Sequence, residues 1–296
     1  MSRSILLACI TNLLVVLSTT AMAQDGSFRL PTYPAQDPPP ARTEAELAKL
    51  LSGASQSPGG ASEAAPLRVV LVSGPKDHGQ GEHDYPAWLE VWSRLLARAS
   101  QTHVETAFEF PSDEQFAAAD VVVFYQRGSW NDQRAQAIDG FLQRNGGLVY
   151  VHWAVDGRGG QVEMAKRIGL ASLGGSIRYR HGPLEIDFEP AADHPVARNF
   201  HKIRWVDESY WMLTGDPAQI RIIGTSLEDN APRPVFWTID HEPGRVFVSI
   251  PGHYMWTFDD PAFRTLLLRG IAWAGHRDVD RFNDIVRLDA RLVPSP

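Results

Sequence analysis

Cysteine is almost absent from the 296-residue chain, in which Cys9 is the one example. It lies within residues 1–23, which have the pattern of a secretory signal peptide. Arg3 precedes an apolar core from Ile5 to Leu17, and Ala21-Met22-Ala23 forms a cleavage site. Cleavage there would leave a chain without cysteine, which excludes disulfides, thiolate metal ligands and cysteine nucleophiles. This combination predicts a periplasmic or secreted protein, and it suits a bacterial periplasm best.

Long apolar runs and positive charge are also scarce. The run from Ile5 to Leu17 is short and is interrupted by Thr11 and Asn12, so we expect no stable membrane span after signal cleavage. The formal net charge is −7 at pH 7, and loss of Arg3 would make it −8. An acidic balance of this kind argues against a nucleic-acid partner.

The remaining chain divides into three parts by composition. Residues 24–66 form a Pro/Gly/Ser-rich linker with one short helix, Thr43–Leu51, whose Thr43 and Glu46 make a capping box. Residues 67–275 form the domain, and residues 276–296 form a C-terminal tail. Because 44% of the chain is hydrophobic, the domain can bury one large core.

Strand and helix patterns alternate through the first half of the domain. The expected strands are Leu67–Val72, Val104–Phe108, Val121–Tyr125 and Leu148–Val151, and the expected helices include Pro86–Ala99, Asp132–Arg144 and Pro261–Ala274. The second half is richer in strands, with a hairpin formed by Val235–Ile239 and Val246–Ile250. We therefore predict an α/β fold, a doubly wound and mostly parallel sheet with an added β-rich C-terminal half.

The loop from Ser73 to Trp88 follows the first strand and carries many ionisable groups, among them Lys76, His78 and His83. In open α/β sheets ligands bind beyond the carboxyl ends of the strands, so this loop is a candidate binding site. Gln80-Gly81 stands where a phosphate-binding loop needs Lys-Ser/Thr, and Asp84 replaces the last glycine of a dinucleotide motif. No nucleotide is therefore expected. The alternative to a binding site is that the loop is exposed to solvent and its charged side chains have no specific role.

Histidines follow three of the predicted strands. If these strands are parallel, His78, His83, His152 and His253 converge on one edge of the sheet and could bind a divalent metal such as zinc. Alternatively, each histidine caps a strand or donates to a backbone carbonyl. The other histidines are assigned to structure or surface, with His194 fixing a turn before Pro195; they are His103, His181, His201, His241 and His276.

Glu208 lies in an aromatic run and is the best candidate for a general base. With Tyr210 it would perform acid–base chemistry beside the catalytic candidates His152 and His253. The alternative is that Glu208 pairs with an arginine such as Arg178 or Arg204.

Substrate binding is assigned to Lys76, His78 and a set of aromatic residues after the strand ends. Aromatic rings offer large contact areas to the apolar face of a sugar. The alternative is that they belong to the core. The candidates are Trp130, Trp153, Tyr254 and Trp256.

The chain resembles the ThuA-like (trehalose utilisation) family over about Leu67 to Gly275. The motifs that carry the resemblance are Gly74-Pro75-Lys76-Asp77-His78-Gly79-Gln80-Gly81-Glu82-His83-Asp84-Tyr85-Pro86, Gly146–His152, His194-Pro195-Val196, Asp207-Glu208-Ser209-Tyr210, Gly244–Val248, Gly252-His253 and Leu268–Ala274.

The resemblance implies a flavodoxin-like fold related to class I glutamine amidotransferases. Those enzymes place a cysteine on a sharp turn after a central strand and serve it with a later histidine. Here His152-Trp153-Ala154 follows the comparable strand, and Gly252-His253 takes the place of the later histidine. Because there is neither Cys nor Ser at the turn, this is not a glutamine amidotransferase.

The resemblance also implies a role in the catabolism of disaccharides or oxidised sugars. We therefore expect a periplasmic enzyme that hydrolyses, eliminates or isomerises a disaccharide or keto-sugar, with a small-molecule carbohydrate as partner. One alternative is a non-catalytic sugar-binding or scaffolding module, and another is a metal-dependent hydrolase of esters or amides. Whether the protein forms a homo-oligomer is left open.

Overall fold

A computed structural model describes residues 35–53 and 65–295, and a nine-stranded sheet forms its centre. In sheet order the strands are β3 (Thr102–Phe108), β2 (Leu67–Ser73), β4 (Val121–Tyr125), β5 (Gly147–Val151), β12 (Arg245–Ser249), β11 (Ala231–Asp240), β10 (Arg221–Glu228), β7 (Arg178–Asp187) and β8 (Lys202–Trp211). The first five run parallel, and each later strand is antiparallel to its neighbour.

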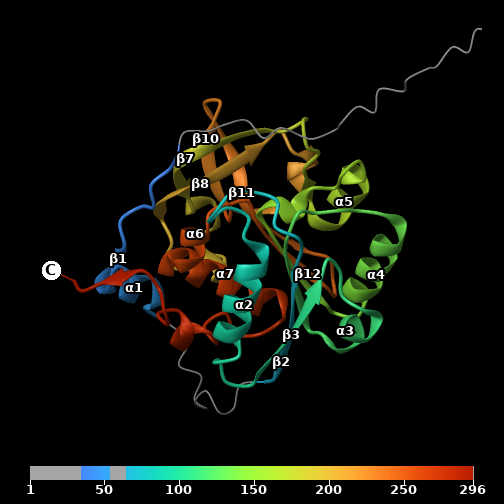
Figure 1. Cartoon of the computed structure of the whole chain (residues 1–296), viewed down its shortest axis with the longest axis horizontal. Helices are drawn as coiled ribbons and strands as arrows, with labels where there is room; N and C mark the ends of the chain where they lie inside the picture. Colours follow the sequence, from blue (N-terminus) through green and yellow to red (C-terminus); the bar gives the residue numbers. More distant parts are fainter. Residues whose placement is uncertain (1–34, 54–64, 296) are drawn as a thin grey trace, which may run out of the picture. The chain divides into compact units, whose positions relative to one another are not determined.

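Helices cover the parallel part of the sheet (Figure 1). On one side lie α2 (Tyr85–Leu96) and α7 (Pro261–Ala274), and on the other lie α3 (Asp113–Ala118), α4 (Asp132–Gln143) and α5 (Gln161–Ile168). Strands β4 and β5 are buried along their whole length, as expected for parallel strands covered on both faces. The predicted class I glutamine amidotransferase-like fold, with its β-rich second half, is confirmed.

The hairpin of β11 and β12 joins the two parts of the sheet. Strand β12 pairs antiparallel with β11 and parallel with β5, from Arg245 opposite Gly147 to Ser249 opposite Val151. The chain therefore leaves β12 at the same edge where it leaves β5 and β2. The short α6 (Met255–Asp259) follows that exit and leads into α7.

The segment before the domain packs onto it through α1 (Glu44–Leu51), whose Thr43–Glu46 capping box is present as predicted. Leu47 and Leu50 are buried in the core, and the buried Arg269 of α7 donates to the carbonyl of Leu50 at 3.0 Å. Just before α1, β1 (Arg42–Thr43) pairs with β13 (Leu292–Val293) near the other end of the chain. The predicted signal peptide lies outside the described residues.

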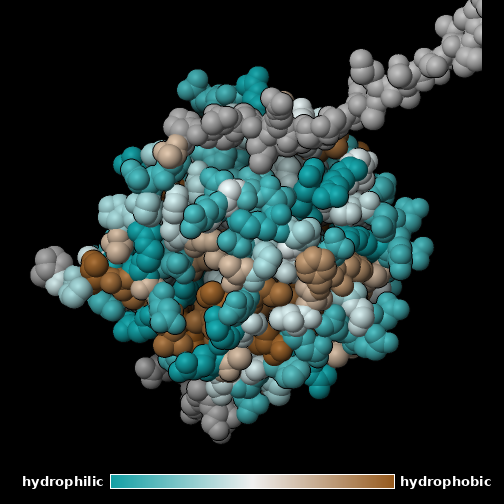
Figure 2. All heavy atoms as spheres, viewed as in Figure 1, coloured by the Kyte–Doolittle hydropathy of each residue, from teal (hydrophilic) through white to brown (hydrophobic). Residues whose placement is uncertain are grey.

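The visible face is mostly hydrophilic, with apolar atoms gathered near α1 and α2 (Figure 2). Val91 of α2 is an exposed apolar side chain, with 39% of its surface accessible. Within residues 35–53 and 65–295, no helix combines the length and apolar character that a membrane crossing requires.

His194 fixes a turn, as predicted, because its Nδ1 accepts the backbone N–H of Val196 at 3.2 Å. The ring is buried against Trp273, and burial together with the nearby Arg221 lowers the pKa of His194 from 6.5 to about 4. Because the folded pKa lies below the unfolded value, the unfolded chain binds the proton first. The contribution of His194 to stability is present above pH 6.5 and is lost as the pH falls towards 4.

We expect wild-type protein to lose about 2 kcal/mol more unfolding free energy between pH 7 and pH 4.5 than a His194→Asn variant. Asparagine can still accept the Val196 N–H, but it does not titrate. Urea unfolding at both pH values, with a chelator present, measures the difference. All other titrating groups are shared by the two proteins, so an equal loss in both would contradict the assignment.

Candidate functional site

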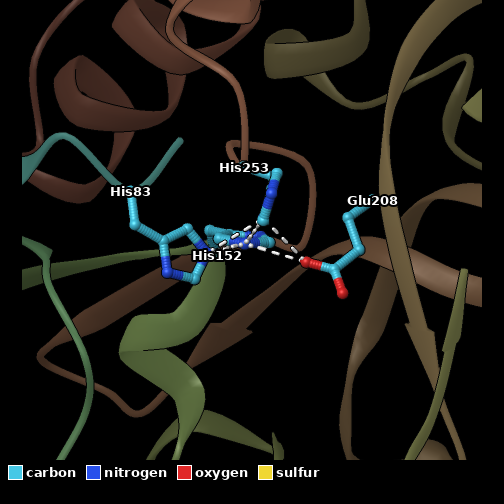
Figure 3. Close-up of side chains that lie close together, drawn as sticks. All are labelled: His83, His152, Glu208 and His253. Atoms are coloured by element: carbon cyan, nitrogen blue, oxygen red, sulfur yellow. Dashed lines mark hydrogen bonds and ion pairs between the residues drawn. The ribbon is translucent and has the colours of Figure 1, made fainter. Parts of the chain in front are cut away.

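Four buried side chains converge beyond the carboxyl ends of the parallel strands, and we call them the His–Glu cluster (Figure 3). His83 comes from the loop after β2, His152 directly follows β5, and His253 follows β12. Glu208 reaches them from within β8. Each of the four residues is at most 4% exposed, so water cannot screen the charges and dipoles of the cluster.

The ligand-type atoms of the cluster point at one another. His83 Nε2 lies 2.7 Å from His152 Nε2 and 3.0 Å from His253 Nδ1, and the last two atoms are 3.3 Å apart. The Oε2 atom of Glu208 lies 2.9 Å from His253 Nδ1 and 3.3 Å from His152 Nε2. All four ligand atoms lie within 4.8 Å of one another. This spacing fits a single metal ion.

In His83 and His152, the contacts of the ring nitrogen that faces away from the cluster fix the protonation state of the nitrogen that faces into it. His152 Nδ1 lies 2.7 Å from the carbonyl oxygen of Ile250, which can only accept, so this nitrogen carries the proton. His83 Nδ1 likewise donates to Asp77 Oδ1 at 2.9 Å. The two Nε2 atoms therefore face each other with lone pairs, and a cation bound by both would relieve their repulsion. Carbonyl and carboxylate partners of this kind are typical of metal-binding histidines.

The electrostatics of the cluster favour neutral His83 and His152. Burial lowers the pKa of both rings, that of His83 well below its usual value. Burial also disfavours charge on His253, but hydrogen bonds to Glu208 and Glu82 outweigh it and raise its pKa to about 9. Burial opposes ionisation of Glu208, yet its histidine partners hold the pKa of its carboxyl well below the usual range. A bound metal ion would displace the proton on His253.

Asp207 holds two parts of the site together, and the sequence did not identify it. Its Oδ1 accepts the backbone N–H groups of Glu208 at 2.7 Å and of Gly252 and His253 at 3.0 Å each. Its Oδ2 accepts the hydroxyl of Thr257 in α6. The fully buried carboxylate thus fixes the Glu208 strand against the turn that carries His253.

We expect Asp207→Ala to lower the free energy of unfolding by about 3–5 kcal/mol, because three buried N–H groups lose their acceptor. Asp207→Asn keeps one acceptor oxygen and should cost about 1–2 kcal/mol. Urea unfolding of both variants in the presence of a chelator separates this effect from metal binding. Equal losses in the two variants would show that the carboxylate does not anchor these N–H groups.

Two of the three histidines have a left-handed backbone. The φ angle is 41° at His83 and 57° at His152, values that non-glycine residues rarely adopt. Such strain costs about 1–3 kcal/mol per residue and is concentrated at functional sites. His152 occupies the sharp turn directly after the central strand β5.

His181, which the sequence analysis assigns to structure or surface, lies beside the His–Glu cluster. It pairs directly with Glu208 across β7 and β8, and its Nε2 lies 3.4 Å from Glu208 Oε1. Its Nδ1 lies 2.9 Å from the hydroxyl of Tyr254. The alternation that predicted this strand began only at Gly182, so the strand was expected to start after His181.

No arginine in the described part of the chain forms an ion pair with Glu208. Arg178 pairs with Asp229 at 2.6 Å, and Arg204 is exposed. The partners of Glu208 are histidines and the hydroxyl of Tyr210, which donates to Oε2 at 3.1 Å and lies 2.8 Å from His152 Nε2. The predicted grouping of His152, Glu208, Tyr210 and His253 is therefore present in the structure.

Two of the predicted substrate-binding residues lie beside the cluster without joining it. The centre of the His78 ring lies 3.7 Å from that of His83, with the two rings tilted by 51°, and His78 Nδ1 binds Asp77 at 2.8 Å. His78 is therefore a neighbour of His83 rather than a member of the four-residue set, although it forms a second potential group with Asp77 and His83. The Tyr254 ring lies 4.6 Å from that of His253 and stacks on Trp256 at 4.1 Å.

Trp153, Lys76 and Trp130, which are also predicted to bind substrate, differ from one another in their surroundings. The Trp153 ring meets the edge of Tyr210 at 5.4 Å. Lys76 binds the carbonyl of Glu82 at 2.6 Å and the carboxylate of Asp84 at 3.4 Å, so it braces the loop. Trp130 packs against the core, where the Arg167 guanidinium lies 5.8 Å from its ring.

These features define an α/β protein of the class I glutamine amidotransferase-like fold, with His152 on the turn that follows β5. The chain belongs to the ThuA family, since the family model described as "Trehalose utilisation" matches residues 68–274.

Two solved structures share the fold. A putative ThuA-like protein from Parabacteroides merdae is 22% identical, with a TM-score of 0.58 and coverage of 71% of this chain and 90% of that one. A putative ThuA-like protein from Bacteroides uniformis is 14% identical, with a TM-score of 0.57 and coverage of 71% and 92%. A search of curated proteins gave no match.

Proposed function

We propose that this ThuA-family protein is a metal-dependent carbohydrate-processing enzyme. His83, His152, His253 and Glu208 would hold one divalent ion. The observation that carries the proposal is the 2.7 Å approach of two imidazole nitrogens whose protons are held on the opposite side of each ring. Without a cation between them these two groups repel each other.

A bound ion would supply Lewis-acid polarisation of a substrate oxygen. The chain itself supplies the proton chemistry. Burial raises the pKa of Tyr210 well above 10, so its hydroxyl keeps its proton and can donate it to a developing alkoxide beside the cluster. The stacked rings of Tyr254 and Trp256 would contact the apolar face of a sugar.

The substrate class is a disaccharide or keto-sugar, and the reaction is a hydrolysis, an elimination or an isomerisation. Support comes from the family description, trehalose utilisation, and from the position of His152 where a nucleophile would stand. A nitrogen at that position cannot form the thioester of an amidotransferase, but it can ligate a metal.

Incubation of metal-loaded and chelator-treated protein with a panel of disaccharides and keto-sugars tests the proposal. We expect product only with the metal-loaded protein. Saturable sugar binding without product after long incubation would instead support a non-catalytic sugar-binding module. Turnover of esters or amides in a parallel panel would support a metal-dependent hydrolase of another class.

Export to the periplasm is part of the same proposal, and it rests on the pattern of residues 1–23. Expression of the full chain in a bacterial host, followed by fractionation, tests it. The protein is expected in the periplasmic fraction with Gln24 as its first residue. Recovery from the cytoplasm with Met1 intact would contradict it.

A further inference from the structure

One distance in the His–Glu cluster differs from the others. The five pairs of ligand atoms given above are 2.7–3.3 Å apart. For the sixth pair, the ligand atoms of Glu208 and His83 lie within 4.8 Å, and no ion pair at 4.0 Å or less joins these two described residues. Figure 3 shows the reason, since His83 and Glu208 approach from opposite sides and His152 and His253 lie between them.

This pattern of distances between pairs of ligand atoms, which are the edges of a coordination polyhedron, distinguishes two coordination geometries. In a tetrahedral zinc site with ligands at about 2.0–2.1 Å, all six ligand–ligand edges are equal at about 3.3 Å. In an octahedral site with ligands at about 2.1 Å, neighbouring ligands are about 3.0 Å apart and opposite ligands about 4.2 Å. Five short edges and one long edge match four corners of an octahedron, with His83 opposite Glu208.

An octahedron with these four corners filled has two empty corners. One lies opposite His152 and the other opposite His253. Because His152 and His253 are themselves neighbours, the two empty corners are also neighbours, about 3.0 Å apart. Two oxygen atoms on adjacent carbon atoms can span that separation in a five-membered chelate ring.

We propose that the cluster holds one six-coordinate transition-metal ion and leaves two adjacent positions open for a chelating substrate. This rests on the proposed function and deepens it. The substrate would bind through two oxygens on neighbouring carbons, such as the hydroxyl and carbonyl oxygens of a hydroxyketone. The expected metal is one that accepts imidazole and carboxylate in octahedral geometry, such as Mn²⁺, Fe²⁺ or Ni²⁺, rather than the tetrahedral zinc that the sequence suggested.

The hydroxyl of Tyr210 borders one of the open positions, since it lies beside both His152 Nε2 and Glu208 Oε2. It donates a hydrogen bond to Glu208 Oε2, and a phenol that keeps its hydrogen is a poor metal ligand. Its place is suited to a hydrogen bond with a chelated substrate oxygen, and it leaves both positions to the substrate.

The test loads metal-free mature protein with one equivalent of Mn²⁺ and measures the relaxation of water protons, which counts exchangeable water on the ion. Glycolate and acetate serve as probes because both are small monoanions, and only glycolate can chelate through neighbouring carbons. We expect two exchangeable waters. Saturating glycolate should remove the signal of both and acetate that of one, and glycolate should bind at least about tenfold more tightly.

Visible absorption of the Co²⁺-loaded protein gives a second readout, with weak six-coordinate bands expected. Intense four-coordinate bands and no exchangeable water would overturn this inference while leaving a metal site in place. Failure to bind either ion would overturn the proposed function as well. A Tyr210→Phe variant should show the same two waters, whereas a gain of one water over wild type would show that the hydroxyl fills a position.

Discussion

A His152→Ala protein is expected to bind divalent metal about 100- to 1,000-fold more weakly than wild type. The reason is that His152 Nε2 touches both other ring nitrogens and the Glu208 carboxylate, so its loss removes one ligand and the group that bridges the rest. One ligand of four carries roughly a quarter of the binding free energy of such a site, which is about 3–4 kcal/mol. Isothermal titration with Mn²⁺ or Co²⁺ measures the change.

Two further variants make this result interpretable. His152→Asn removes the ligand but retains a residue that tolerates the left-handed backbone, so it separates metal loss from backbone strain. His201→Ala removes an exposed histidine that pairs with Glu189 on the surface and should leave the affinity unchanged. Wild-type affinity in both His152 variants would show that the cluster is not a metal site.

Removal of one oxygen atom, in Tyr210→Phe, should lower kcat by about 10²- to 10⁴-fold while metal content stays at the wild-type level. The hydroxyl lies 2.8 Å from His152 Nε2, and the ring that carries it is buried, so the substitution leaves packing almost unchanged. Steady-state kinetics with a sugar that the wild-type protein turns over measure kcat, and elemental analysis measures the metal content.

Tyr150→Phe is the matched control for that variant. Tyr150 is also buried, on β5, but its ring stacks on Phe124 rather than facing the cluster. We expect its kcat to equal that of wild type. A similar fall in both variants would indicate a general loss of structure instead of a proton-transfer role for Tyr210.

The sequence predicted the fold well because periodicity reports burial, and burial decides this architecture. The runs Val121–Tyr125 and Leu148–Val151 are apolar throughout, and only strands covered on both faces have that pattern. Once those strands are parallel, the residues that follow them meet at one edge. His83, His152 and His253 could therefore be placed together without any knowledge of their contacts.

The missed residues depend on contacts that periodicity does not encode. Asp207 matters because it accepts N–H groups from Gly252 and His253, which are 45 and 46 positions away in the chain. His181 matters because the register of β7 and β8 places it opposite Glu208, and a register shift of one residue would turn it to the other face. Neither relation leaves a mark on the local sequence.

Because α1 packs on the domain, it belongs to the part of the chain that must fold together. Arg269, only 1% exposed, depends on the carbonyl of Leu50 for one of its hydrogen bonds, and Arg42 pairs with Asp260, the residue that caps α7, at 3.0 Å. A protein shortened by a protease, or by design, to begin at Leu67 would lack the acceptor of a buried guanidinium, and the core residues that Leu47 covers would become exposed. Any shortened protein should therefore begin before Arg42, even though composition places that residue in a linker.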